Sequence, residues 1–106
     1  MSGSQALLCF TTLPDQAAAD KLAESLVAER LAACVSILAP CRSVYRWQGA
    51  IHKDNEIPLL IKTTADRYAE LERHLRQNHP YELPELIAVE ITQGLPAYLD
   101  WLTAQI

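Results

Sequence analysis

The stretch EIPLLIKTT, residues 56–64, decides the fold of this 106-residue chain. Its apolar and β-branched residues predict a strand, and the side chains of a strand alternate between its two faces. Ile57, Leu59 and Ile61 share one face, whereas Leu60 lies on the other. We therefore expect a strand that carries apolar side chains on both of its faces.

The residues before this strand predict the other arm of a long β-hairpin. LAACVSIL, residues 31–38, is an extended apolar run that breaks at Pro40. SVYRWQGAI, residues 43–51, then alternates between two faces in the manner of a strand. HKDNE, residues 52–56, is polar and is expected to be the turn that joins the two arms.

Helices and further strands are predicted on either side of the hairpin. Apolar residues recur every three or four positions over residues 19–31 and again over residues 68–75, which predicts two amphipathic helices. Pro80 ends the second helix, because the residue before a proline is pushed out of helical geometry. Two short apolar runs predict buried strands, and the last segment predicts a short helix. These are ALLCFTT (residues 6–12), LIAVEIT (86–92) and PAYLDWLTAQI (96–106).

In chain order, the expected elements are β-α-β-β-α-β, followed by a short C-terminal helix. This is the order of a ferredoxin-like α+β fold, in which two helices cover one face of an antiparallel sheet. Right-handed crossovers leave few other arrangements. A chain of 106 residues is expected to form a single domain, here residues 1–106.

The second face of this sheet has no predicted cover. A sheet face that contacts water should be polar, yet in the first strand Leu7 and Cys9 oppose Leu8 and Phe10, which are also apolar. The uncovered face would expose on the order of several hundred Å² of apolar surface, at or above what a monomer usually tolerates. We therefore expect an obligate homo-oligomer. The alternative is that the C-terminal helix folds over this face of its own chain.

The composition excludes several classes of partner. The net charge is −4 and the pI about 5.2, so no overall positive field attracts nucleic acid or acidic lipid. The N-terminus, MSGSQALLCFTT, lacks a basic start, and its apolar run is too short for a signal peptide or a membrane span. This predicts a cytoplasmic protein without a membrane partner. The three cysteines share no Cys-x-x-Cys spacing, which fits a reducing compartment.

The sequence also lacks the common motifs of enzymes. With only three glycines, it has no phosphate-binding loop. It contains no Gly-x-Ser-x-Gly elbow, no His-Glu-x-x-His motif and no Cys–His nucleophile pattern. We therefore expect a protein that is not an enzyme. The alternative, a small lyase or hydrolase that uses Lys62, Glu90 or Tyr81 at an interface, has little to support it.

Five stretches of the chain are characteristic when they are taken together. They are LVAERLAACVSI, SVYRWQG, IKTT, HPYELPELIAVEI and YLDWL. With these stretches in this order over almost its whole length, the chain resembles the divalent cation tolerance (CutA) family. The resemblance implies a ferredoxin-like protomer, a homotrimer whose three sheets pack around the threefold axis, and a link to tolerance of copper and other divalent metals. The trimer of the family also resembles the PII signalling proteins.

The resemblance also implies candidate metal ligands. His79 is the histidine of the HPY motif. Some relatives carry a second histidine where this chain has Asn78, and a first-strand cysteine where it has Thr11; Cys9 lies two residues away. His79 and Cys9 are therefore the candidate ligands for Cu²⁺ or another divalent cation, with no cofactor required. A single imidazole binds copper only weakly. The alternative for His79 is that it caps the last carbonyl groups of the second helix.

Other residues are candidates for a pocket between subunits. Lys62 and Glu90 lie within strands, where charge is uncommon, and either pair with each other or contact a neighbouring subunit. Tyr45 and Trp47 share a face of the hairpin and either pack at an interface or line a pocket. With Tyr81, these residues form the candidate inter-subunit pocket. Four further side chains are expected on the surface, namely His52, His74, Glu82 and Glu85.

Two functions follow from these observations. The first is a non-enzymatic homotrimer that acts in tolerance to divalent metal ions and binds copper or another divalent cation weakly. The second is a PII-like signalling or scaffolding trimer that binds a small ligand or a protein partner between its subunits.

Overall fold

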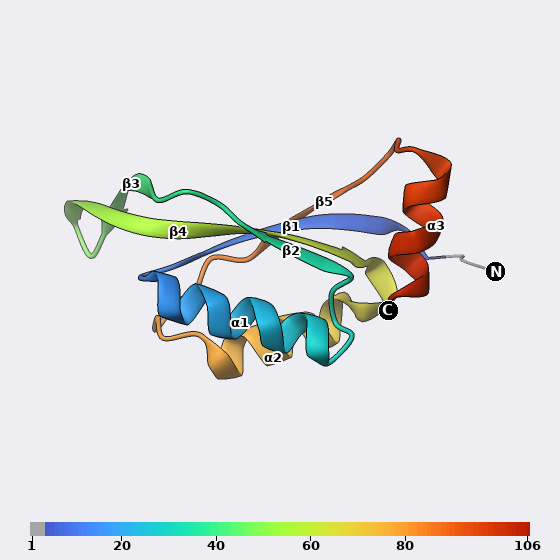
Figure 1. Ribbon diagram of the computed structural model, residues 1–106. Helices are drawn as coiled ribbons and strands as arrows, with labels where there is room; N and C mark the ends of the chain where they lie inside the picture. The colour runs from blue at the N-terminus through green and yellow to red at the C-terminus, as the bar shows by residue number, and fades with distance from the viewer. Residues whose placement is uncertain (1–3) are drawn as a thin grey trace.

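The computed structural model describes residues 4–106 and consists of an antiparallel sheet with two helices on one face (Figure 1). The strand order is β2-β4-β1-β5, and β3 extends the pairing along β4. This confirms the predicted ferredoxin-like α+β fold, with the first arm of the hairpin divided into β2 and β3. The elements are β1 (Ala6–Leu13), α1 (Gln16–Ala28), β2 (Cys34–Ile37), β3 (Cys41–Trp47), β4 (Ala50–Thr64), a 3₁₀ turn (Ala65–Arg67), α2 (Tyr68–Asn78), β5 (Ile87–Glu90) and α3 (Pro96–Ala104).

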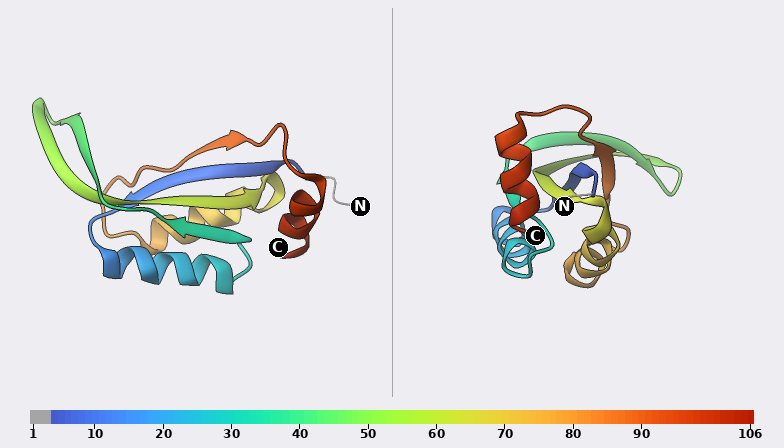
Figure 2. Two further views of the ribbon diagram at one scale, coloured as in Figure 1. Left: turned by 45° about the horizontal axis from the view of Figure 1, so that its top comes forward. Right: turned by 90° about the vertical axis from the view of Figure 1, so that its right-hand side faces the viewer.

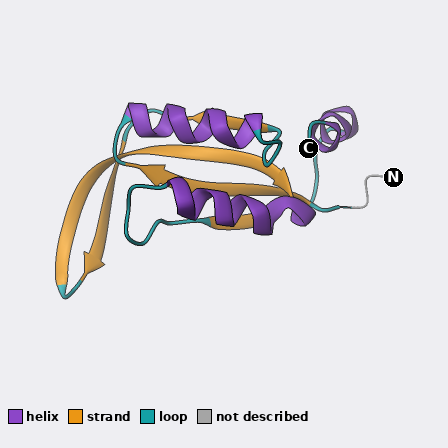
Figure 3. Ribbon diagram, turned by 90° about the horizontal axis from the view of Figure 1, so that it is seen from below, coloured by secondary structure: helices purple, strands orange, loops and turns teal. Residues whose placement is uncertain are grey.

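The core lies between the sheet and the two helices α1 and α2, which run side by side beneath it (Figure 3). Alternate residues of β1 and β4 face the helices, and the register pairs Cys9 with Ile61 on this side. The apolar stripes predicted for the helices are buried here. The fully or almost fully buried core side chains include Cys9, Leu13, Leu22, Leu26, Leu59, Ile61, Leu71 and Leu75.

Local sequence signals determine where the helices begin and end. Asp15 caps α1, because its carboxylate accepts a hydrogen bond from the Ala18 N–H at 2.8 Å. Helix α2 ends at Asn78, and His79, which precedes Pro80, is extended as predicted. Thr64 precedes the 3₁₀ turn that leads into α2, and its hydroxyl bonds to the carboxylate of Asp66.

The hairpin turn is at Gln48–Gly49, so its prediction at residues 52–56 is wrong. Trp47 pairs with Ala50, and both intervening residues have positive φ, 50° at Gln48 and 81° at Gly49. Two-residue turns of this left-handed kind match the twist of the strands that they join. The polar residues 52–56 lie within β4 because this part of the strand forms an arm that projects beyond the sheet (Figures 1 and 2). The arm makes the molecule elongated, with a longest extent of 48 Å.

The sheet face opposite α1 and α2 is called the open face here. The register places Phe10 of β1 beside Leu60 of β4 and Ile87 of β5 on this face. Helix α3 packs at one end of the sheet (Figure 1), yet Ile87 and Val89 remain 56% and 60% exposed. The alternative that α3 covers this face alone is therefore wrong. Oligomerisation through the open face stays a prediction.

Candidate functional site

A groove of about 1120 Å³ lies where the arm leaves the sheet. One wall comes from β3 and β4, and the other from the loop that follows α2. Tyr45, Trp47 and Tyr81, three residues of the predicted pocket, line it together. Four carboxylates line it as well, and none of the lining residues is a lysine or an arginine. The full lining is Phe10, Thr12, Ser43, Val44, Tyr45, Trp47, Asp54, Asn55, Glu56, Tyr81, Glu82, Leu83, Pro84 and Glu85.

Glu56 is the centre of the hydrogen bonds in this groove. It is only 9% exposed, and it accepts bonds from Ser43 Oγ at 2.6 Å and from Tyr81 Oη at 3.0 Å. Burial and the bond to Glu56 raise the pKa of Tyr81 far above that of a free phenol, so Tyr81 stays protonated and donates. Sequence reasoning missed Glu56 because it assigned this residue to a turn. The available signal was that Glu56 is a charged residue directly before an apolar β-strand.

A second bond joins the two strands of the arm further out. Tyr45 Oη donates to the carboxylate of Asp54, and the Tyr45 ring stacks on His52 with 5.5 Å between centroids. His52 is thus a half-buried strand residue, and its prediction as an exposed turn residue is wrong. His74 is also half-buried, because its Nε2 lies 2.8 Å from Ser25 Oγ of α1.

His79 uses both of its ring nitrogens inside the chain. Its Nδ1 accepts the N–H of Tyr81 at 3.1 Å, so Nε2 carries the proton and donates to the carbonyl of Thr12 at 2.8 Å. The side chain is 9% exposed, and burial lowers the pKa of His79 below its usual value. The neutral ring therefore joins the end of α2 to β1. It does not cap the last carbonyl groups of α2, so that alternative is wrong.

Cys9 lies in the core between the sheet and the helices and has no solvent exposure. Its burial raises the pKa of the thiol to about 11. Within residues 4–106, no group of three or more His, Cys, Asp or Glu side chains is arranged to hold a metal ion. The structure thus places both candidate ligands, His79 and Cys9, in buried positions where neither belongs to such a group.

Lys62 and Glu90 lie on opposite faces of the sheet. Lys62 is opposite Leu8 on the open face, whereas Glu90 is opposite Leu7 on the helix face. Lys62 Nζ donates to Tyr98 Oη of α3 at 3.1 Å and lies 5.2 Å from the centroid of that ring. The predicted pairing of Lys62 with Glu90 within one chain is therefore wrong, and neither residue lines the groove.

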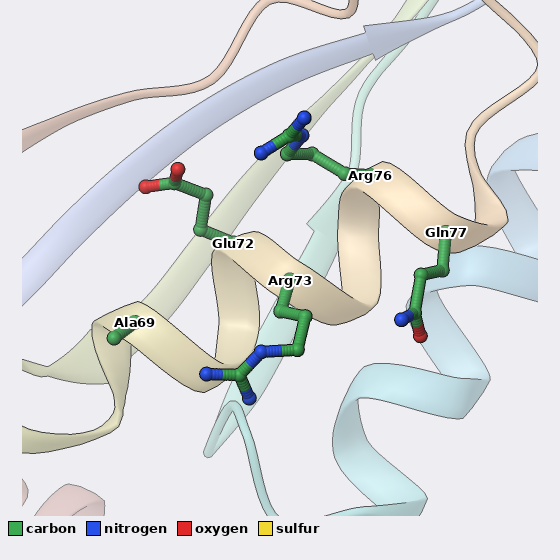
Figure 4. Close-up of a pocket in the computed structure, with 5 residues that line it drawn as sticks. All are labelled: Ala69, Glu72, Arg73, Arg76 and Gln77. Atoms are coloured by element: carbon green, nitrogen blue, oxygen red, sulfur yellow. The ribbon is translucent and has the colours of Figure 1, made fainter.

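Another hollow follows the surface of α2 (Figure 4). All of its lining residues come from this one helix, so no second element encloses it. It is part of a solvated helix face, on which Arg67 and Glu70 form an ion pair at 2.9 Å. The lining residues are Ala69, Glu72, Arg73, Arg76 and Gln77.

These features define a class of protein: a ferredoxin-like sheet extended by a β-hairpin arm, with an acidic and aromatic groove at the base of that arm. Residues 7–105 match the family described as CutA1 divalent ion tolerance protein. The chain belongs to this family, which confirms the family predicted from the sequence.

Relatives and solved structures agree with this assignment. The divalent-cation tolerance protein CutA of Thermus thermophilus is 45% identical over 91 residues, which cover 86% of this chain and 88% of the relative. The crystal structure of CutA from Xylella fastidiosa is 48% identical with a TM-score of 0.93, covering 97% of this chain and 99% of that one. The structure of CutA1 from Oryza sativa has a TM-score of 0.95 at 37% identity, covering 99% and 96%.

The family name does not specify a compartment. A relative from Arabidopsis thaliana, 44% identical over 91% of this chain and 53% of its own length, is named Protein CutA, chloroplastic. In the described part of this chain, no helix is both long enough and apolar enough to cross a membrane.

Proposed function

We propose that this protein acts in tolerance to divalent cations as a non-enzymatic, cytoplasmic homotrimer that binds such cations weakly. The observation that carries this proposal is the acidic lining of the groove. Asp54, Glu56, Glu82 and Glu85 line it without a lysine or an arginine among them. Carboxylate oxygens are suitable ligands for divalent ions such as Mn²⁺ and Mg²⁺.

Weak binding follows from how these carboxylates are placed. They line one groove but do not form a group of three converging donors. Glu56 already accepts two hydroxyl bonds, and Asp54 accepts one. A cation in the groove would therefore keep much of its water and gain mainly electrostatic attraction.

Copper would need different donors, because it favours nitrogen and sulfur. Binding by His79 requires the ring to give up its bond to Thr12 or to Tyr81. Binding by Cys9 requires access to the closed core and loss of a proton held at a raised pKa. His79 and Cys9 remain the proposed copper ligands. Binding by either one would break hydrogen bonds or open the core, whereas binding by the groove carboxylates would not.

The trimer in this proposal is supported by the open face. Ile87 and Val89 leave large apolar side chains more than half exposed there, and covering such a surface stabilises an assembly. The number of three subunits comes from the family resemblance.

Calorimetric titration with Mn²⁺ and with Cu²⁺ tests the cation site. Replacing Glu82 and Glu85 by Gln should weaken Mn²⁺ binding severalfold, because two negative charges leave the groove. Glu24→Gln removes one charge from the exposed side of α1 and should leave binding unchanged. Equal affinities in the groove variant and the wild type would refute the groove as the site. Copper binding that is lost in His79→Ala would assign copper to His79.

A second candidate function is a signalling or scaffolding trimer that binds a small ligand or a protein partner between subunits. It is favoured by the three aromatic side chains, Tyr45, Trp47 and Tyr81, that share the groove. A metabolite that raises the melting temperature where divalent cations do not would support it. Loss of that effect in Trp47→Ala would place the ligand in the groove.

A further inference from the structure

Lys62 is a charged residue of the open face and lies beside α3. The register across the sheet places Val89, Leu8, Lys62 and Cys34 in one row. The next row contains Ile87, Phe10, Leu60 and Ser36. Lys62 thus brings the single charge to these two rows, which are otherwise mostly apolar.

The proposed trimer would bury this ammonium group. Among residues 4–106, the hydrogen-bond partner of Lys62 Nζ is the phenol of Tyr98, and Glu90 lies on the other face of the sheet. A buried charge that lacks an opposite charge is strongly destabilising. The covering subunit therefore needs to supply a carboxylate.

The groove provides such carboxylates, and Glu85 is the one best suited. Asp54 and Glu56 accept hydroxyl bonds, whereas no hydrogen bond is found for Glu82 or Glu85 among residues 4–106. Of these two, Glu85 is the one that lies near the buried carboxylate of Glu56. Partial burial and the nearby charge of Glu56 raise the pKa of Glu85, so its anion would be stabilised by a cation. The surface that has one unpaired positive charge and the groove that has only negative charges are complementary.

We propose that Lys62 of each subunit enters the groove of the next subunit and pairs there with Glu85. This inference rests on the trimer of the proposed function and specifies how its subunits meet. With one lysine among four carboxylates, the groove stays negative, so the contact leaves a site for a divalent cation.

The same contact is of the kind from which a closed ring can be built. Lys62 and Glu56 are six positions apart on β4, or roughly 20 Å in an extended strand. The lysine and the carboxylates of the groove are therefore far apart along the same face of β4, so a contact between them on two subunits is head-to-tail. Head-to-tail contacts leave one unused surface at each end until a ring closes.

Charge reversal tests this pairing, with oligomeric state measured by light scattering over a dilution series. Lys62→Glu and Glu85→Lys should each raise the concentration at which the trimer dissociates by about tenfold or more, because like charges then meet at the contact. The double variant restores opposite charges and should recover most of the wild-type assembly. The control combines Lys62→Glu with Glu82→Lys and should not recover it.

A measurement on the wild-type protein covers the case in which a variant does not fold. A carbodiimide joins a lysine to a carboxylate in direct contact, and mass spectrometry should find Lys62 of one chain linked to Glu85 of another. Intermolecular links that join Lys62 only to other carboxylates would overturn the pairing, as would single variants that assemble like the wild type. A wild-type protein that is monomeric at micromolar concentration would instead refute the trimer itself.

Discussion

The phenol of Tyr81 donates a hydrogen bond of 3.0 Å to Glu56 Oε1 and so joins the loop after α2 to the base of the arm. These residues are 25 positions apart in the sequence. The backbone N–H of Tyr81 also bonds to His79, whose ring in turn bonds to Thr12 at the end of β1. One short loop thus positions the arm relative to the sheet and forms a wall of the groove.

Removing the Tyr81 hydroxyl should destabilise the protein. Tyr81→Phe leaves the half-buried ring in place but takes one donor from the buried carboxylate of Glu56, at a cost of about 1 kcal/mol in the free energy of unfolding. Urea denaturation measures this loss. Tyr45→Phe deletes the same atom on the exposed arm and should cost clearly less. Equal losses in the two variants would contradict the role given to Glu56.

Stability should fall when the pH drops below about 6.5, the usual pKa of histidine. Burial lowers the pKa of His79 in the folded state, so the unfolded chain takes up this proton first. The contribution of the neutral ring is then fully present above the unfolded pKa and is lost as the pH falls towards the folded pKa.

Melting temperatures between pH 8 and pH 5 measure this effect. His79→Gln should be less stable at pH 8 and should lose less stability on acidification than the wild type does. His52→Gln, which removes a histidine from the arm, is the matched control and should keep the wild-type slope. An unchanged slope in His79→Gln would show that another group causes the acid sensitivity.

Cys9 should resist thiol reagents while the protein is folded. Its side chain has no exposure, and burial raises the pKa of the thiol to about 11, so little thiolate is present at neutral pH. Labelling with a disulfide reagent should modify Cys41 first, since it is only partly buried and lies off the open face, and Cys9 only on unfolding. Early labelling of Cys9, read by mass spectrometry of peptides, would contradict this order.

The hairpin turn should be sensitive to substitution at Gly49. Gly49→Ala meets no atom within 4 Å, so its cost comes only from the positive φ of 81° and should be about 1 kcal/mol. Gln48→Gly makes the opposite change at the neighbouring residue, whose φ is 50°, and should be neutral or stabilising. Urea denaturation of both variants measures this difference. A loss of stability in Gln48→Gly would show that positive φ is not what determines the stability of the turn.

Much of the fold could be predicted because it depends on periodic patterns. The apolar spacing over residues 68–75 correctly identified Leu71 and Leu75 as buried, and Pro80 correctly marked the end of α2. The turn was misplaced because polar residues 52–56 resemble a loop when they are viewed without their partner strand. In the structure they pair with β3 along the arm, so their backbone groups are satisfied although many of their side chains face water.

The candidate site was predicted only in part. Tyr45, Trp47 and Tyr81 were predicted to share a pocket between subunits, and the structure brings all three into one groove of a single chain. Glu56 was missed. Of the two alternatives for Lys62 and Glu90, pairing with each other is excluded, because they lie on opposite faces of the sheet. A shift of one residue in register reverses the face of every side chain, and sequence alone does not provide that register.

The amino-acid sequence by itself determined the order of strands and helices, the buried stripes and the family, because these depend on spacing along the chain and on residues that are close in sequence. Only the tertiary structure decided that Glu56 accepts hydrogen bonds from Tyr81 and Ser43, and that both ring nitrogens of His79 form hydrogen bonds. It also decided that Lys62 and Glu90 lie on opposite faces of the sheet. Each of these depends on which residues strand pairing and packing bring within about 3 Å of one another, the range over which hydrogen bonds form.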